Sequence, residues 1–182
     1  AIAFDNVVDL PVTVTGGKSA VLVFDTRPSW SSTFVRRALE ADPRFVVDHR
    51  VRIAPALTAG TAAGRLDPAV LDAAPLVIAG APDALSEADV ELLDHYVRNR
   101  GGSLILLPER APSGPAARLF DGEWREQLLA QPETAGPLRA AELLRPRAIG
   151  FGSSAISPVV IATPRGLGRI AVSGAMDAWR HR

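Results

Sequence analysis

The sequence predicts an α/β fold: a three-layer, flavodoxin-like sandwich with a mostly parallel sheet that ends in a C-terminal β-hairpin. Three observations predict it. Apolar runs typical of buried strands, at residues 20–24, 75–80 and 103–108, alternate with segments of helical periodicity. Each helical segment has its own start and stop signals. Two further strand-like runs, at residues 158–162 and 169–173, are separated only by a turn that contains Pro and Gly, which indicates a hairpin.

Length and composition indicate one globular domain. The chain has 182 residues, of which 47% are hydrophobic and 22% charged, and this suffices for one domain with its own core. We place this domain at residues 19–182, after a β-rich lead-in or extended arm at residues 1–18 that the turn Gly16-Gly17 closes. The start at Ala1 and the stop soon after an apolar strand lead us to expect that the chain is part of a longer protein.

The charge balance argues against nucleic acid as a partner. Lys and Arg together number 20, as do Asp and Glu, so no overall field favours a polyanion or an anionic membrane surface. The sequence also has no run of about 18 apolar residues that would span a bilayer. We therefore expect the chain as given to be soluble.

The first half of the chain predicts two strands, a helix between them and a second helix after them. Ser29, Ser31 and Ser32 are each able to cap the first helix, which Asp42-Pro43 stops. Residues 45–53 then alternate apolar and polar side chains, which predicts a strand more exposed than the first. After a connection rich in Ala, Gly and Thr, Asp67 caps a short helix with Pro68 at its first position.

The second half is regular up to residue 108 and weaker beyond it. Ser86 and Asp89 form a capping box at the start of a helix that extends through Arg98. Gly101-Gly102 ends this helix in a left-handed cap, and the fourth strand follows. Residues 109–152 show only an amphipathic piece at residues 124–129 before the hairpin.

Several catalytic and ligand-binding motifs are absent or misplaced. The chain has no cysteine, which excludes a Cys nucleophile and thiolate metal sites. Its histidines, His49, His95 and His181, do not have metal-ligand spacing, so we expect neither a metal ion nor a cofactor. The GGKS stretch at residues 16–19 precedes a strand instead of a helix, the glycines of residues 166–168 lie in a hairpin turn, and no Gly-x-Ser-x-Gly elbow exists.

The carboxyl edge of the sheet is the candidate site, because open α/β sheets bind ligands there. A structural interpretation, which we favour, is that Ser29 caps the helix and Trp30 covers the sheet end. The alternative is that Arg27 and the helix N-terminus hold an anion or a partner's carboxylate. The candidate residues at this edge, including those after the last strand, are Asp25, Arg27, Ser29, Trp30, Glu109, Asp177, Trp179 and Arg180.

Four segments together resemble one family. They are VLVFDTRPSWSSTFVRRALEADPRF, PLVIAGAPDALSEADVELLDHYVRNRGGSLILLP, the Gly-x-Gly-Arg turn and the closing SGAMDAWRHR. Over residues 19–182 the chain resembles the class I glutamine amidotransferase-like domains of large bacterial membrane proteins, which often stand beside von Willebrand factor A-type regions. Members that are active use a Cys on a sharp turn, with a His and a Glu from a later segment.

The resemblance implies a domain without amidotransferase activity. The expected nucleophile position, after the strand at residues 103–107, is occupied by Pro108, and no His-x-Glu pair stands near the last strand. The resemblance therefore implies a non-catalytic binding or scaffolding module of a membrane-anchored bacterial protein, outside the cytoplasm. Its partners would be another protein or other domains of the same chain.

Two alternatives to this module remain open. One is a hydrolase-type enzyme that uses Glu109 or Asp25 as general base; it predicts a deep pocket with a desolvated carboxylate of raised pKa. An ion pair that joins Arg27 or Arg180 to Asp25 or Asp177 would argue against it. The other is a structural role, in which Trp30 packs on the terminal DAWR segment.

Overall fold

The computed structural model describes residues 16–54, 57–60, 65–120, 124–129, 138–143, 149–150 and 160–176. The closing segment with Asp177, Trp179 and Arg180 lies outside these ranges, as does the lead-in up to residue 15. The helices are α1 (Trp30–Glu40), α2 (Pro68–Asp72) and α3 (Glu87–Arg100), with short 3₁₀ turns η1 (Pro82–Ala84) and η2 (Gly114–Leu119). The strands are β1 (Ser19–Asp25), β2 (Phe45–Ala54), β3 (Leu57–Gly60), β4 (Leu76–Gly80), β5 (Ser103–Leu107), β6 (Trp124–Leu129), β7 (Leu138–Leu143), β8 (Ile149–Gly150), β9 (Val160–Arg165) and β10 (Gly168–Ser173).

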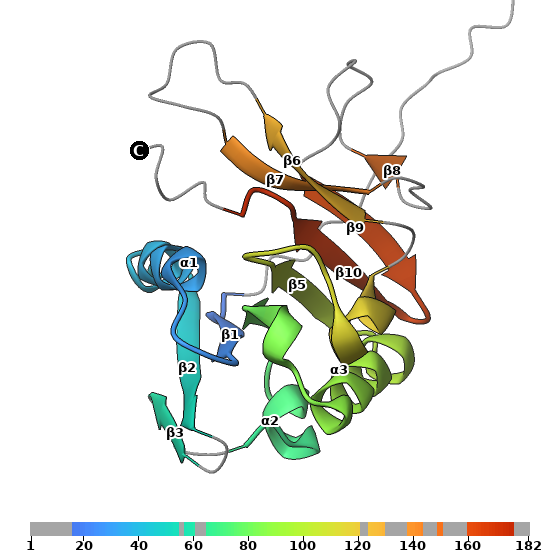
Figure 1. Cartoon of the computed structure of the whole chain (residues 1–182). Coiled ribbons are helices and arrows are strands. Elements are labelled where there is room, and N and C mark those ends of the chain that lie inside the picture. Colours follow the sequence, from blue (N-terminus) through green and yellow to red (C-terminus); the bar gives the residue numbers. More distant parts are fainter. Residues whose placement is uncertain are drawn as a thin grey trace, which may run out of the picture.

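The described residues form an α/β domain around one large sheet (Figure 1). Its eight strands lie in the order β3-β2-β1-β4-β5-β10-β9-β8, and the five strands β2, β1, β4, β5 and β10 run parallel. The outer strands β3, β9 and β8 pair antiparallel to their neighbours. The predicted mostly parallel sheet and its C-terminal hairpin, β9–β10, are confirmed.

Helices cover both faces of the central strands. Successive residues of a strand point to opposite faces, so each face has its own apolar cluster. On one face Val21 and Val23 pack with Val35 and Leu39 of α1. On the other face Leu22, Phe24 and Leu104 join α3 residues in a larger apolar cluster. The strands β1 and β4 are buried almost completely, which explains their continuous apolar sequences.

The predicted helix caps are confirmed, with Ser29 as the cap of α1, while α3 extends to Arg100 instead of Arg98. The Ser29 side chain accepts a hydrogen bond from the Ser32 N–H at the start of α1, and Asp67 caps α2 in the same way with Pro68 following. The capping box of Ser86 and Asp89 opens α3, and Gly101 ends it at φ +74°. The caps at the helix starts satisfy N–H groups that have no partner within the helix, and each contributes about 1 kcal/mol. At the end of α3 the Gly101 N–H donates to the Tyr96 carbonyl.

Two regions differ from the prediction. The connection after β2 contains β3, which folds back antiparallel on β2; its small residues do not alternate, so periodicity missed it. The amphipathic piece at residues 124–129 is strand β6, which pairs with β7 in a separate two-stranded sheet. Among the described residues, no helix is long and apolar enough to cross a membrane.

Candidate functional site

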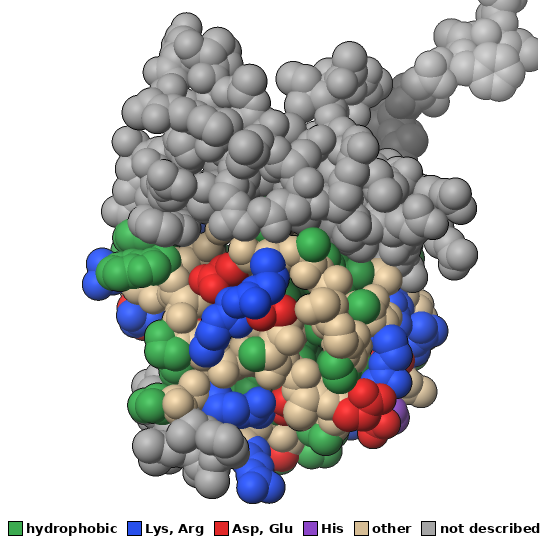
Figure 2. Space-filling view, viewed as in Figure 1, with side chains coloured by type: hydrophobic (Ala, Val, Ile, Leu, Met, Phe, Trp, Pro, Cys, Tyr) green, Lys and Arg blue, Asp and Glu red, His purple; other side chains and the backbone are tan. Residues whose placement is uncertain are grey.

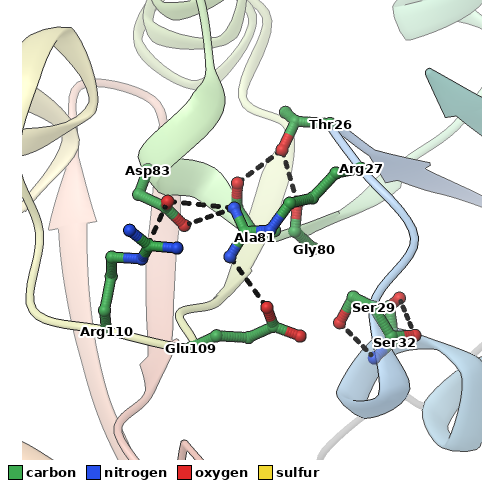
Figure 3. A network of polar contacts seen from close by, with 9 residues as sticks. All are labelled: Thr26, Arg27, Ser29, Ser32, Gly80, Ala81, Asp83, Glu109 and Arg110. Carbon is green, nitrogen blue, oxygen red and sulfur yellow. Dashed lines mark hydrogen bonds and ion pairs between the residues drawn. The ribbon is translucent and has the colours of Figure 1, made fainter. Parts of the chain in front are cut away.

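Arg27 and Glu109, two of the described candidate residues, lie at the carboxyl edge of the sheet in an ion-pair network centred on Arg27 (Figure 3). The Arg27 guanidinium donates from Nη1 to both carboxylate oxygens of Asp83, at 3.0 and 2.9 Å, and from Nη2 to Glu109 Oε2 at 2.8 Å. Arg110 Nε lies 3.1 Å from Asp83 Oδ2. Because these residues follow β1, β4 and β5, the network ties together three neighbouring strand ends.

Arg27 does not pair with Asp25, the contact that would have argued against a hydrolase; the other residues of that test, Asp177 and Arg180, lie outside the described ranges. The sequence prediction brought Arg27 and Glu109 to the same edge but missed Asp83, which stands in η1 after β4. Only the adjacency of β1 and β4 reveals that partner. On the face shown in Figure 2, acidic and basic side chains adjoin one another, as the balanced charge predicts.

Asp25 ends β1 and is almost fully buried, at 2% exposure. His49 Nε2, on the neighbouring strand β2, lies 3.0 Å from Asp25 Oδ2. The other oxygen, Oδ1, has no hydrogen-bond partner among the described residues. The carboxyl group therefore has one polar contact with His49 and one oxygen that burial deprives of water.

Burial raises the pKa of Asp25 above its ordinary value, and the nearby negative charge of Glu109 raises it further. His49 opposes this rise, as does the hydroxyl of Ser32, which lies near the carboxyl group without good hydrogen-bond geometry to Oδ1. The net effect favours the protonated acid, which has no charge to lose from water. Asp25 is thus desolvated, which is one part of what the hydrolase hypothesis predicts; the deep pocket around it stays a prediction.

Gly80 makes the position of Asp25 possible. A Cβ at residue 80 would stand 2.0 Å from Asp25 Oδ1 and 2.9 Å from Ser32 Cβ, so no larger residue fits while the carboxyl group stays in place. The next residue, Ala81, has φ +48°, the one positive φ among the described non-glycine residues. The Thr26 hydroxyl donates to the Ala81 carbonyl and fixes this turn against the end of β1.

Glu109 is the more accessible carboxylate, with a side chain 25% exposed against 2% for that of Asp25. Arg27 binds only its Oε2, and Figure 3 shows the other oxygen directed away from Arg27. No described residue donates a hydrogen bond to that second oxygen. Glu109 is therefore oriented by Arg27 and retains one oxygen for a further contact.

Ser29 and Trp30 have structural positions at the start of α1. Ser29 is buried and caps the helix, as the structural interpretation predicts. Trp30 is 61% exposed and stacks on Phe34 one turn later, with ring centroids 6.2 Å apart. Contact of Trp30 with the closing DAWR segment stays a prediction, because that segment lies outside the described residues.

Pro108 is buried directly after β5. Neither it nor Glu109 has a positive φ, so this turn has no left-handed residue. Of the histidines, His49 lies close to the candidate site, where it contacts Asp25. This contact was not predicted from the sequence, although the place of His49 on the alternating strand β2, next to β1, was an available signal. No cluster of three or more potential metal ligands occurs among the described residues.

Comparisons with known proteins found similar folds among solved structures. No family model and no curated protein matches the sequence. Among solved structures, the chain resembles an exo-β-1,4-mannosidase from Opitutaceae bacterium strain TAV5, with 17% identity over 87% of this chain and 31% of that chain, at a TM-score of 0.50. It also resembles a β-galactosidase from Rahnella sp. R3, with 18% identity over 87% of this chain and 28% of that chain, at a TM-score of 0.51.

A third solved structure, the GH42 β-galactosidase Gan42B, has 13% identity over 90% of this chain and 29% of that chain, at a TM-score of 0.50. The chain therefore spans less than a third of the length of these three enzymes. At these identities the similarity shows a shared fold for this portion.

These comparisons correct the family assignment. The chain does not match glutamine amidotransferase-like domains; the structures that share its fold are glycoside hydrolases. The interpretation of Pro108 as a degenerate nucleophile position depended on that assignment and is not tested by the comparisons. The prediction that the chain is not an enzyme is also contradicted. It depended on the missing catalytic residues of an amidotransferase, whereas the solved structures that share the fold are enzymes of another class. The resemblance of short sequence segments was therefore misleading.

Proposed function

We propose that this chain is a hydrolase-type domain of a larger carbohydrate-active enzyme, with its working carboxylates at the carboxyl edge of the sheet. The observation that carries the proposal is the pairing of two carboxyl groups in unlike environments: Asp25 is buried with a raised pKa, and Glu109 is accessible beside Arg27. Acid and base roles in hydrolysis are divided between carboxyl groups by such a difference in environment. The shared fold with glycoside hydrolases supports glycosides as the substrate class.

Glu109 is the group we assign as general base. Its Oε2 is held by Arg27, so its second oxygen is available to take a proton from water. Arg27 also donates two hydrogen bonds to Asp83, so its guanidinium group is shared between Asp83 and Glu109. Asp25 is the proton-holding partner at the same edge.

The strand order supports this location. Taken alone, the five parallel strands lie in the order second, first, third, fourth and fifth along the chain, which is the flavodoxin-like order. We infer a flavodoxin-like three-layer sandwich on this basis. In that layout ligands bind where the connections from the first strand diverge, between β1 and β4, and Asp25, Arg27 and Asp83 stand at that point.

The partners of this chain and its location in the cell are also proposals. The chain spans less than a third of the solved enzymes it resembles, which supports a domain that works with other domains of a longer chain. That the parent protein is anchored in a membrane, with this domain outside the cytoplasm, stays a prediction.

The test is hydrolysis of 4-nitrophenyl β-galactoside and β-mannoside by this chain and by the full-length protein that contains it. We expect release of 4-nitrophenol, reduced about 100-fold or more in Glu109→Gln and reduced also in Asp25→Asn. Glu87→Gln is the matched control, because Glu87 is an ion-paired glutamate on α3 with a 58% exposed side chain. No hydrolysis by either protein, or full activity in Glu109→Gln, would overturn the proposal.

A further inference from the structure

A cavity lies at the amino edge of the sheet, opposite the candidate site and beside the Gly-x-Gly-Arg turn of the hairpin. Its volume is about 480 Å³, within the range of small-molecule sites. It is lined by Gly101, Ala162, Thr163, Pro164, Leu167, Gly168 and Arg169. Most of these residues present apolar or backbone atoms, and Arg169 is the one charged side chain among them.

The turn that forms this cavity is locked to the end of α3. The Leu167 N–H donates to the Arg98 carbonyl at 2.9 Å, and the Arg169 N–H donates to the Gly102 carbonyl at 3.3 Å. A Cβ at residue 168 would stand 2.2 Å from the Gly102 carbonyl oxygen, so the two segments touch through their backbones. The cavity wall is therefore preformed, and a ligand would not have to order it.

Arg165, which stands directly before the turn, is held by contacts outside the cavity. Arg165 Nε donates to Asp94 Oδ1 at 2.7 Å, and its Nη2 donates to the Arg118 carbonyl at 2.9 Å. Arg165 is thus neutralised within the protein. The Arg169 side chain, in contrast, forms no hydrogen bond or ion pair with any described residue, and it is exposed.

The charge at this place favours an anion. The carboxyl end of α3 carries a partial negative charge of about half a unit, which would oppose one. Its last carbonyls, however, already accept hydrogen bonds, Tyr96 from Gly102 and Arg98 from Leu167. The full positive charge of Arg169 is therefore larger than the partial negative charge that remains at the end of α3. An apolar cavity with one guanidinium that no described residue pairs matches a ligand that has an apolar body and one carboxylate.

We propose that this cavity, which we name the hairpin cavity, binds a small apolar carboxylic acid, with the carboxylate at Arg169 and the apolar body against Ala162, Pro164 and Leu167. This site is separate from the carboxyl edge, and the proposal does not depend on the proposed function.

The probe is 4-phenylbutanoate, compared with its uncharged amide, in titrations followed by ¹H–¹⁵N spectra of the chain at low salt. We expect saturable shifts of the Gly101, Leu167, Gly168 and Arg169 amides. The amide should bind about two- to fivefold more weakly than the acid, the range for one solvent-exposed ion pair.

Two variants separate the charge from the apolar wall. Arg169→Gln should abolish the preference for the acid and leave binding of the amide unchanged. Leu167→Ala should weaken both ligands without affecting the fold, because Leu167 is 77% exposed. Arg37→Gln, a change in the last turn of α1, is the charge-matched control and should alter neither.

Three outcomes would overturn the proposal: no shifts at millimolar probe, shifts that map away from the hairpin, or equal binding of acid and amide by the wild-type chain. The readout is binding at identified amides, so it succeeds or fails independently of any glycoside hydrolysis.

Discussion

His49 Nε2 lies 3.0 Å from one oxygen of the buried Asp25 carboxyl group, whereas the other oxygen has no hydrogen-bond partner among the described residues. A fully ionised Asp25 would therefore leave negative charge on a buried, unsolvated oxygen. The folded protein favours the protonated form of Asp25, since burial raises the pKa of this group. The protonated state of Asp25 affects stability, the substitutions that neighbouring positions tolerate and the proposed chemistry.

The first prediction concerns the pH dependence of stability. Because the pKa of Asp25 is raised in the folded state above its ordinary 3.8, the folded chain retains a proton that the unfolded chain loses. The stability contributed by this group is therefore complete below pH 3.8 and is lost as the pH rises through the folded-state pKa. An asparagine side chain has no proton to lose, so Asp25→Asn should gain stability relative to wild type between pH 4 and 7. Thermal melts of both proteins across this range measure the difference, and a difference that stays constant or shrinks would contradict the assignment.

The second prediction is that replacing Gly80 even by alanine destabilises the fold. The new Cβ would overlap Asp25 Oδ1 at 2.0 Å and press on Ser32 Cβ at 2.9 Å. We expect Gly80→Ala to lower the free energy of unfolding by about 1 to 3 kcal/mol, the usual effect of overpacking. Gly17→Ala, where nothing lies within 4 Å, is the control for the glycine-to-alanine change itself. Chemical denaturation measures both, and Gly80→Ala/Asp25→Ala should recover part of the loss.

The third prediction concerns Arg27, whose side chain is 30% exposed while its partner Asp83 is only 10% exposed. Arg27→Ala leaves Asp83 with Arg110 alone, so we expect a loss of about 1 to 2 kcal/mol after allowance for solvent screening. Arg27→Lys should recover only part, because an ammonium group cannot form the fork that spans Asp83 and Glu109. Urea unfolding tests this; Arg44→Ala, which removes an exposed ion pair to Asp42, should show no measurable change.

The fourth prediction concerns Asp89, which caps α3 and accepts two hydrogen bonds from Arg52, each 3.0 Å long. Burial raises the pKa of Asp89, but the hydrogen bonds from Arg52 and Ser86 outweigh burial and lower it overall. Its stabilisation is therefore present above pH 3.8 and is lost as the pH falls through the lowered pKa. Asp89→Ala should cost about 2 to 3 kcal/mol at pH 7 and less in acid. A cost that does not change with pH, or one matched by Glu87→Ala, would contradict this account.

The sequence predicted the elements whose causes are local. The caps Ser29, Ser86 and Gly101 and the buried runs of β1, β4 and β5 depend on a few neighbouring residues, so each was recognisable alone. Strand β3 was missed because its stability comes from pairing with β2 rather than from its own pattern. Local signals also misled the family assignment, since strand-turn-helix segments of this kind recur in unrelated α/β proteins.

The sequence predicted where the site lies but not which of its side chains contact one another. The carboxyl ends of parallel strands meet at one edge, and this rule placed Asp25, Arg27 and Glu109 together. Which partners they choose depends on strand register: Arg27 meets Asp83 across 56 positions of sequence, and Asp25 meets His49 across 24. The residues that lie between these partners in the sequence do not indicate that the partners meet.

The last prediction uses Tyr96, the single tyrosine of the chain. Its ring is buried against Gly102, where a Cβ would stand 2.0 Å from Cζ, and its hydroxyl donates to the Ala74 carbonyl at 2.8 Å. Burial raises the pKa of Tyr96 to about 12, and a weaker contact with the Ser103 backbone opposes this rise. Absorbance at 295 nm should therefore show ionisation near pH 12 in the folded chain and near pH 10 in denaturant. The stability that the protonated phenol contributes is complete below pH 10 and is lost as the pH rises toward 12, so circular dichroism must be recorded in parallel to show that the fold persists. A midpoint near pH 10 with the circular dichroism unchanged would mean that the Tyr96 hydroxyl is solvated and that α3 does not pack against Gly102 as described.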